Sequence, residues 1–178
     1  MLDAVQIMQK IIEGYANNPK WLNVPLGGIK TLSNTHVGKV GEDFIKMWCQ
    51  KHHLKWSSPS STQSPWDIRI ESITFEIKSA TEDVNGNFQF NHIRRHREYD
   101  ALLVLGISPN DIRFDAWGKD TVVQDKAGRL ATMDKESNAT FKMTKKPSDL
   151  RPIDHFVDGI YELVIDLRKS EDTLLTEN

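Results

Sequence analysis

The stretch Trp66–Lys78, WDIRIESITFEIK, decides the fold. Apolar and polar residues alternate along it, and the apolar set is Ile68, Ile70, Ile73, Phe75 and Ile77. Side chains two residues apart in a strand lie on the same face. The pattern therefore predicts two strands paired as a β-hairpin around Glu71 and Ser72, with one face of the hairpin in the core.

The other face of this hairpin carries charge. If the turn is centred between Glu71 and Ser72, Asp67 lies directly opposite Glu76, with Cβ atoms about 5 Å apart, and Lys78 shares that face. Two opposed carboxylates repel each other unless a cation neutralises them. Mg²⁺ favours a few carboxylates together with water and phosphate oxygens. These residues predict attack on a phosphodiester by a metal-activated water, with Lys78 orienting the water, helping to deprotonate it, or stabilising phosphate charge.

A further carboxylate is expected from the helix before the hairpin. We predict that this helix runs from Thr35, a plausible N-cap, to about His52. Its apolar stripe is Val37, Val40, Phe44, Ile45 and Trp48. Glu42 lies about 60° beyond Ile45 around the helix axis, on the flank of the buried face. It would reach a cleft edge as an extra ligand or water holder; the alternative is a solvated surface glutamate.

These residues resemble the PD-(D/E)xK nuclease superfamily, which has the restriction-endonuclease-like fold. The resemblance covers about residues 35–117, and it is carried by Pro65-Trp66-Asp67, Phe75-Glu76-Ile77-Lys78 and Glu42. It implies an α/β fold with a mixed central β-sheet flanked by helices. It also implies that Asp67, Glu76 and Glu42 bind Mg²⁺ and that Lys78 serves the attacking water.

Within that superfamily the chain looks most like a type II restriction endonuclease, with residues 1–178 as a single nuclease domain. Such enzymes often cut double-stranded DNA as homodimers, because a two-fold duplex site matches a two-fold protein. One alternative is a structure-specific or repair nuclease of the same fold. Another is a non-catalytic DNA-binding module, and RNA stays open as a substrate.

Candidate DNA contacts follow the hairpin. Amides and guanidinium groups can read base edges or hold phosphates, and the candidates are Gln89, Asn91, His92, Arg94, Arg95 and Arg97. Lys142, Lys145 and Lys146 are a second candidate group for phosphate contact. They fall in residues 126–151, which carry seven bases against three acids.

Three other signals are weaker. His92 and His96 are spaced for one helical face, as in a zinc site, but no third ligand is evident nearby. Gly27-Gly28-Ile29-Lys30-Thr31 superficially resembles a phosphate loop, but it lacks a glycine directly before the lysine and a preceding apolar strand. Cys49 is expected to be a buried residue with a structural role.

Composition indicates an ordinary globular protein. The chain has 178 residues, 38% hydrophobic and 27% charged, with a net charge of −2. A single cysteine excludes an internal disulfide. No apolar run reaches the length that spans a membrane, and no signal peptide is apparent. We expect a cytoplasmic protein without a membrane partner.

We expect an amphipathic helix over 2–15, which packs on its own core or forms a dimer face, and a loop over 17–34. After the hairpin we expect a partly helical stretch over 88–99, a buried strand over 101–107 and a strand over 112–117. Irregular structure over 118–158, a strand over 161–167 and an acidic, frayed tail over 168–178 complete the prediction.

Overall fold

The computed structural model describes residues 3–6, 8–9, 19–134 and 138–176. The predicted helix over 2–15 lies largely outside these residues. Within it, residues 4–6 and 8–9 are helical, and the side chains of Val5 and Met8 are 66% and 56% exposed. Neither a core contact nor a dimer face is therefore shown for this segment.

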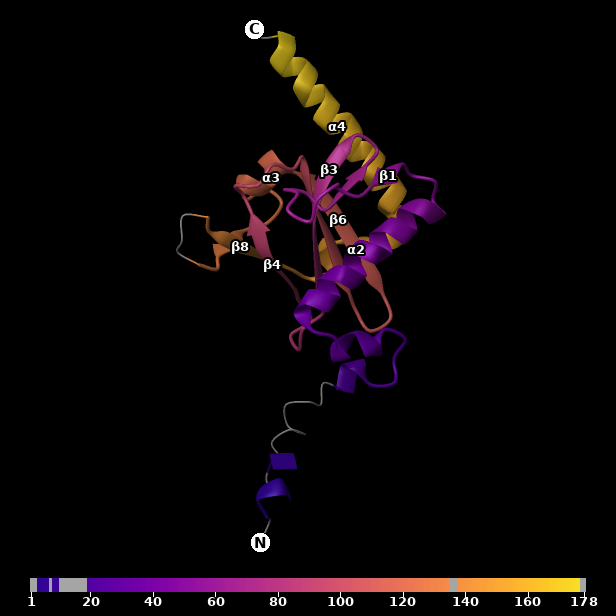
Figure 1. Cartoon of the computed structure of the whole chain (residues 1–178), viewed down its shortest axis with the longest axis vertical. Helices are drawn as coiled ribbons and strands as arrows, with labels where there is room; N and C mark the ends of the chain where they lie inside the picture. Colours follow the sequence, from indigo (N-terminus) through magenta and orange to yellow (C-terminus); the bar gives the residue numbers. More distant parts are fainter. Residues whose placement is uncertain (1–2, 7, 10–18, 135–137, 177–178) are drawn as a thin grey trace.

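Two sheets form the centre of the fold (Figure 1). The six-stranded sheet has the order β1-β2-β3-β5-β6-β9. Its strands are β1 (Trp56–Ser57), β2 (Ile68–Ile70), β3 (Ile73–Thr81), β5 (Ala101–Ile107), β6 (Ile112–Gly118) and β9 (Arg151–Pro152). Only the β3–β5 pair is parallel, so this is the mixed central sheet that the sequence predicted. The second sheet has the order β4-β8-β7, with β4 (Phe88–Arg94), β7 (Leu130–Thr132) and β8 (Thr140–Lys145).

The predicted hairpin is confirmed, including its register. Ile68 pairs with Phe75 and Ile70 pairs with Ile73. The turn places Glu71 at a positive φ of 53°. The short β2 ends the pairing early, because β3 has nine residues and β2 has three.

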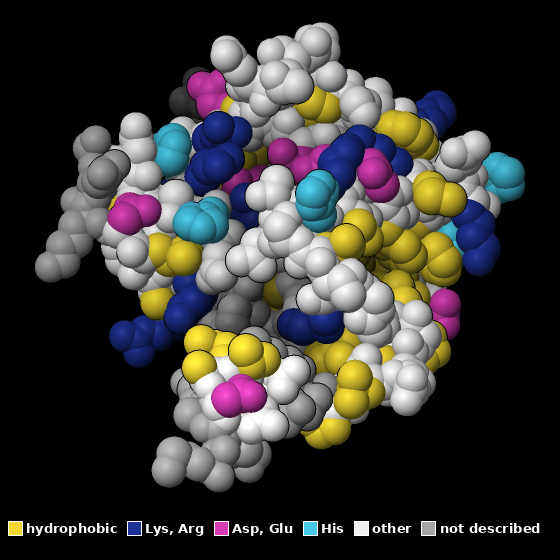
Figure 2. Space-filling view, turned by 60° about the horizontal axis from the view of Figure 1, so that its bottom comes forward, with side chains coloured by type: hydrophobic (Ala, Val, Ile, Leu, Met, Phe, Trp, Pro, Cys, Tyr) yellow, Lys and Arg dark blue, Asp and Glu magenta, His cyan; other side chains and the backbone are white. Residues whose placement is uncertain are grey.

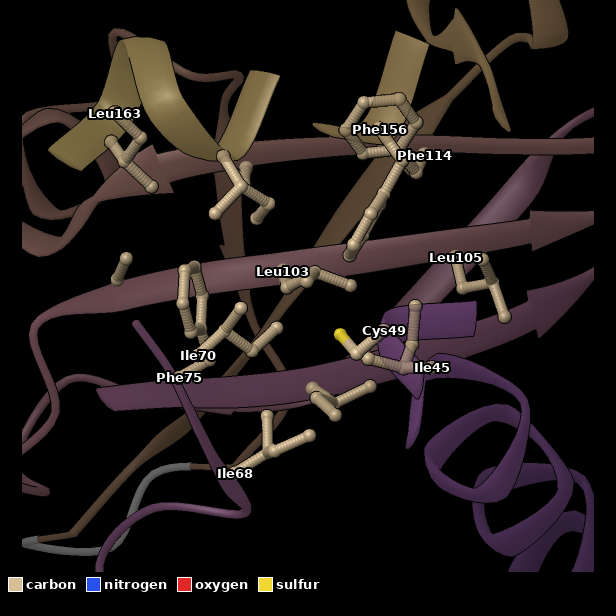
Figure 3. Close-up of a cluster of buried hydrophobic side chains, with 14 of the residues drawn as sticks. Ile45, Cys49, Ile68, Ile70, Phe75, Leu103, Leu105, Phe114, Phe156 and Leu163 are labelled. Atoms are coloured by element: carbon tan, nitrogen blue, oxygen red, sulfur yellow. The ribbon is translucent and has the colours of Figure 1, made fainter. Parts of the chain in front are cut away.

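The helices cover one face of the large sheet. They are α2 (Asn34–Lys51) and α4 (Phe156–Thr176). Figure 3 shows Ile45 and Cys49 of α2, and Phe156 and Leu163 of α4, meeting sheet residues such as Leu103. Helix α2 begins one residue earlier than predicted, and Ser33 rather than Thr35 is its N-cap, because the Ser33 side chain accepts from the His36 amide.

The opposite face of the large sheet is also buried, in agreement with the predicted buried strand over 101–107, but the small sheet that covers it was not predicted. Leu102 and Val104 of β5 point to this side and join a second cluster with Phe88, Phe90 and Met143 of the small sheet. The fold therefore has three layers: helices, the large sheet, and the small sheet together with the short helix α3 (Lys119–Val123).

Several predicted elements are wrong. Residues 88–94 form strand β4 rather than a partial helix, and residues 118–158 contain α3, β7, β8 and β9 rather than irregular structure. Residues 161–167 belong to helix α4, which continues through Thr176, so 168–176 is not a frayed tail. The loop over 17–34 contains two 3-10 helices, η1 (Pro19–Trp21) and η2 (Gly27–Thr31), while η3 (Pro147–Asp149) and η4 (Ile153–His155) flank β9.

Across the described residues, no helix is both long and apolar enough to cross a membrane.

Candidate active site

The candidate site lies at an unpaired edge of β3. Strand β2 pairs with β3 only up to Phe75, and no other described strand covers that edge over residues 76–81. A cleft of about 570 Å³ opens there. It is lined by α2 on one side, β3 on the floor and β4 on the other side. Figure 2 shows acidic side chains gathered in a hollow, with Lys, Arg and His side chains around it.

Asp67 extends the hairpin by one residue and closes its open end. The Asp67 amide donates to the Phe75 carbonyl oxygen at 2.8 Å. The Asp67 carboxylate oxygen Oδ2 accepts from the Ile77 amide at 2.7 Å. The carboxylate thus accepts the hydrogen bond that the Ile77 amide would donate to the backbone of a longer β2. Asp67 also lines the cleft.

Glu76 lies beneath the cleft floor, only 2% exposed. Its Oε1 forms an ion pair with Lys78 Nζ at 3.0 Å. Its Oε2 accepts from the Arg94 amide of β4 at 3.3 Å. The register therefore brings Asp67, Glu76 and Lys78 together as predicted, while the small sheet buries Glu76 more deeply than a solvated hairpin face would allow.

Glu42 of α2 also faces the cleft, as its position on the helix flank predicted. Burial, and then the negative charge of Asp67, raise the pKa of Glu42. Lys39, with Nζ at 3.6 Å from Glu42 Oε2, partly offsets this effect. The part of this rise that comes from Asp67 is repulsion between two ionised carboxylates, which a bound cation would relieve.

These carboxylates suit a hard cation in their chemistry. Mg²⁺ takes oxygen ligands and typically keeps several waters, so two cleft-facing carboxylates with substrate oxygens are compatible with it. The third carboxylate of the predicted ligand set, Glu76, is buried and forms an ion pair with Lys78. Among the described residues, however, no three His, Cys, Asp or Glu side chains are grouped closely enough to hold a metal ion. The ligand set Asp67, Glu76 and Glu42 thus stays a prediction.

Strand β4 forms the opposite wall with four of the predicted DNA contacts, Gln89, Asn91, His92 and Arg94. The β4–β8 register shifts between Phe90 and Ile93, and His92 has a positive φ of 58°. This β-bulge leaves Asn91 and His92 exposed, whereas Phe88, Phe90 and Ile93 of the same strand are buried. Gln89 is held by two bonds, from its Nε2 to Asp83 at 3.2 Å and from Thr144 to its Oε1 at 2.7 Å.

The other predicted contacts lie outside the cleft. The Arg95 guanidinium stacks over the Phe141 ring at 4.1 Å, and the Lys145 ammonium lies over Trp117 and donates to the Ala127 carbonyl. Lys142 shares a face of the small sheet with Thr144, and Lys146 is exposed just after β8. His92 and His96 do not share a helical face, since His92 lies in β4 and His96 in the turn after it.

Two residues at the site escaped the sequence analysis. Gly41 lets α2 approach β3, because a Cβ there would lie 2.7 Å from Ser79 Cβ. The Tyr99 hydroxyl is buried beside Glu76, and burial, the Glu76 charge and a hydrogen bond with Glu76 raise its pKa. A glycine within an amphipathic helix was a usable signal for the first, whereas the contact of Tyr99 with Glu76 depends on tertiary packing.

Comparison with known proteins yields a partial structural likeness and no match in sequence. No known family matches the chain, and no curated protein is similar to it in sequence. Among solved structures, the bacterial homing endonuclease I-Ssp6803I superposes with a TM-score of 0.42 and 12% identity, over 52% of this chain and 74% of that one. This partial likeness carries no argument about function.

Proposed function

We propose that the protein is a Mg²⁺-dependent DNA endonuclease, most like a sequence-specific type II restriction enzyme. One observation carries the proposal: Asp67, Lys78 and Glu42 line one polar cleft, and Glu76 forms an ion pair with Lys78. The structural alternative is a solvated hairpin face. The deep burial of Glu76 argues against it, because an ionisable group is rarely buried without a functional or structural reason.

The chain's own residues have separate tasks in phosphodiester hydrolysis. Asp67, Glu42 and Glu76 would hold Mg²⁺, which would supply positive charge at the phosphate and lower the pKa of a water. Lys78, fixed by Glu76, would donate hydrogen bonds to a phosphate oxygen or to the attacking water. Water forms the new P–O bond as the old P–O bond breaks; the water loses a proton, and the leaving oxygen gains one. In its alternative role as a water holder rather than a ligand, Glu42 at the cleft would accept the water's proton.

The second wall of the cleft supports DNA as the substrate. The exposed Asn91 and His92 offer hydrogen-bonding groups of the kind that contact base edges, and Arg94 offers charge for a phosphate. We propose that sequence specificity resides in this strand. A homodimer acting on a two-fold duplex site is part of the same proposal.

Cleavage of supercoiled plasmid and of linear phage DNA tests the proposal, with and without Mg²⁺. We expect Glu76→Gln and Lys78→Met to lower the cleavage rate by at least about 10²-fold. Glu162→Gln and Lys51→Gln serve as controls, because they remove the same charges from exposed helix positions away from the cleft.

The products distinguish the candidates. Discrete fragments that both site variants abolish support a sequence-specific enzyme. A Mg²⁺-dependent smear keeps the chemistry but favours a structure-specific or repair nuclease. DNA binding without cleavage favours a non-catalytic binding module, and cleavage that survives both substitutions refutes the site.

A further inference from the structure

Residues 19–32 are fastened to the far end of β3, where the cleft ends. The Lys20 ammonium forms an ion pair with the Glu82 carboxylate. The Trp21 indole Nε1 donates to the Glu82 carbonyl oxygen at 3.3 Å, and the Trp21 side chain is buried. The segment is therefore a fixed part of the cleft's surroundings rather than a loose loop.

Lys30 is the cation that this segment presents to the cleft. Its Nζ donates to Thr81 Oγ1 at 3.2 Å, and Thr81 lines the cleft. The same Nζ lies 5.4 Å from the centroid of the Trp21 ring, within cation–π range. Lys30 is exposed and has no ion-pair partner among the described residues. Lys20, by contrast, is neutralised by Glu82.

The glycine-rich stretch before Lys30 explains how it is placed. A Cβ on Gly27 would collide with the Trp21 carbonyl oxygen, so the glycine permits the close return of η2 onto η1. The next turn then carries Lys30 back over the Trp21 ring. The sequence motif is thus not a phosphate loop around a nucleotide but a turn that delivers one lysine to the cleft end.

We propose that Lys30 contacts a backbone phosphate of the bound DNA that lies near the cleaved phosphate but is distinct from it. This inference rests on the proposed function. Lys78 and Thr81 are three residues apart in β3, which corresponds to roughly 10 Å along the strand. A phosphate that Lys30 contacts beside Thr81 is therefore not the phosphate beside Lys78. Contact with Thr81 and Trp21 orders the long lysine side chain before DNA binds, so less of its conformational freedom remains to be lost.

DNA binding without turnover tests the role of Lys30. Fluorescence anisotropy of a labelled 20-base-pair duplex in EDTA would give Kd at several salt concentrations for the wild type, Lys30→Gln and Lys30→Arg. The matched control is Lys51→Gln, because Lys51 Nζ also lies over a tryptophan, 4.6 Å from the Trp48 ring centroid, but away from the cleft. Thermal melting confirms that each variant is folded.

We expect Lys30→Gln to lower the slope of log Kd against log salt by about 0.9. This change corresponds to about fivefold weaker binding at 0.15 M salt. Lys30→Arg should keep the wild-type slope, and so should Lys51→Gln. Equal slopes for Lys30→Gln and Lys51→Gln would overturn the inference even if the wild type cleaves DNA. A lowered slope in a protein that never cleaves DNA would support the contact while refuting the nuclease. A wild type that does not bind DNA refutes both.

Discussion

Two glycines of α2 predict opposite effects of the same substitution. At Gly38 a Cβ would meet no atom of the described residues within 4 Å, whereas at Gly41 it would lie 2.7 Å from Ser79 Cβ and would also overlap Ser79 Oγ. Rotating the Ser79 hydroxyl away would not relieve the first contact, because Cβ is fixed to the backbone of β3. Gly41→Ala must therefore displace α2 from the sheet, and with it the neighbouring Glu42.

Two effects set the expected change in the free energy of unfolding. Replacing a helix-interior glycine by alanine stabilises a helix by about 1 kcal/mol, and this gain is common to both positions. Overpacking costs about 1–3 kcal/mol and applies only to Gly41. We therefore expect Gly38→Ala to raise the free energy of unfolding and Gly41→Ala to fall about 1–3 kcal/mol below it. For a chain of this size, 1 kcal/mol corresponds to about 2–4 °C in Tm.

Urea unfolding of both variants measures this difference directly. Adding Ser79→Gly removes the atom that Gly41→Ala meets, so a double-mutant cycle should recover most of the packing cost. If Gly41→Ala is as stable as Gly38→Ala, the close approach of α2 to β3 is refuted, and so is our account of how Glu42 is placed.

Three further predictions concern other parts of the molecule. Gly106→Ala should destabilise the fold by about 1–3 kcal/mol in urea unfolding, because a Cβ there would lie 2.6 Å from the buried Phe88 ring; a neutral effect would contradict the packing of the small sheet. Burial raises the pKa of Cys49 to about 12, so a thiol reagent at pH 8 should label it only as fast as the protein opens, and labelling at the rate of a free cysteine would contradict this. Because the pKa of Glu42 is raised in the folded state, its contribution to stability is fully present at pH values below the ordinary pKa of 4.5. That stabilisation is lost as the pH rises through the folded-state pKa. Thermal melts should therefore show Glu42→Gln more stable than the wild type at pH 7 but not at pH 4, and a constant difference would contradict the assignment.

The sequence predicted those parts of the fold in which burial follows one simple period. The hairpin alternates strictly, so its register and the proximity of Asp67, Glu76 and Lys78 could be deduced. Strand β5 is a continuous apolar run because both of its faces are buried.

Prediction failed where an apolar pattern fits both the strand and the helix spacing, or where a bulge interrupts the strand spacing. The bulge at Asn91 and His92 shifts the buried positions of β4 from Phe90 to Ile93, which disguises the strand. In α4 the residues Tyr161, Leu163 and Ile165 alternate like a strand, but Tyr161 and Ile165 are 47% and 52% exposed. The buried positions follow the helical spacing of Ile160, Leu163 and Val164.

The candidate site was predictable only in part for the same reason. The hairpin supplies its residues locally, whereas the burial of Glu76 comes from β4, and Tyr99 approaches it only through tertiary packing. Contacts between elements that are distant in the sequence produce no periodic pattern within either element. The deep burial of the Glu76 carboxylate could therefore not be deduced from the sequence.

The two outer strands of the large sheet have a consequence for solubility. Unpaired edges can recruit a strand from another molecule and begin aggregation. Here β1 and β9 have two residues each, and Pro152 in β9 has no amide hydrogen to donate. The sheet therefore offers almost no template for growth at either end. The long unpaired stretch of β3 is instead flanked by α2 and β4, and Asp67 takes up the Ile77 amide. The carboxylate proposed to serve catalysis thus also keeps this stretch of backbone from pairing with another chain.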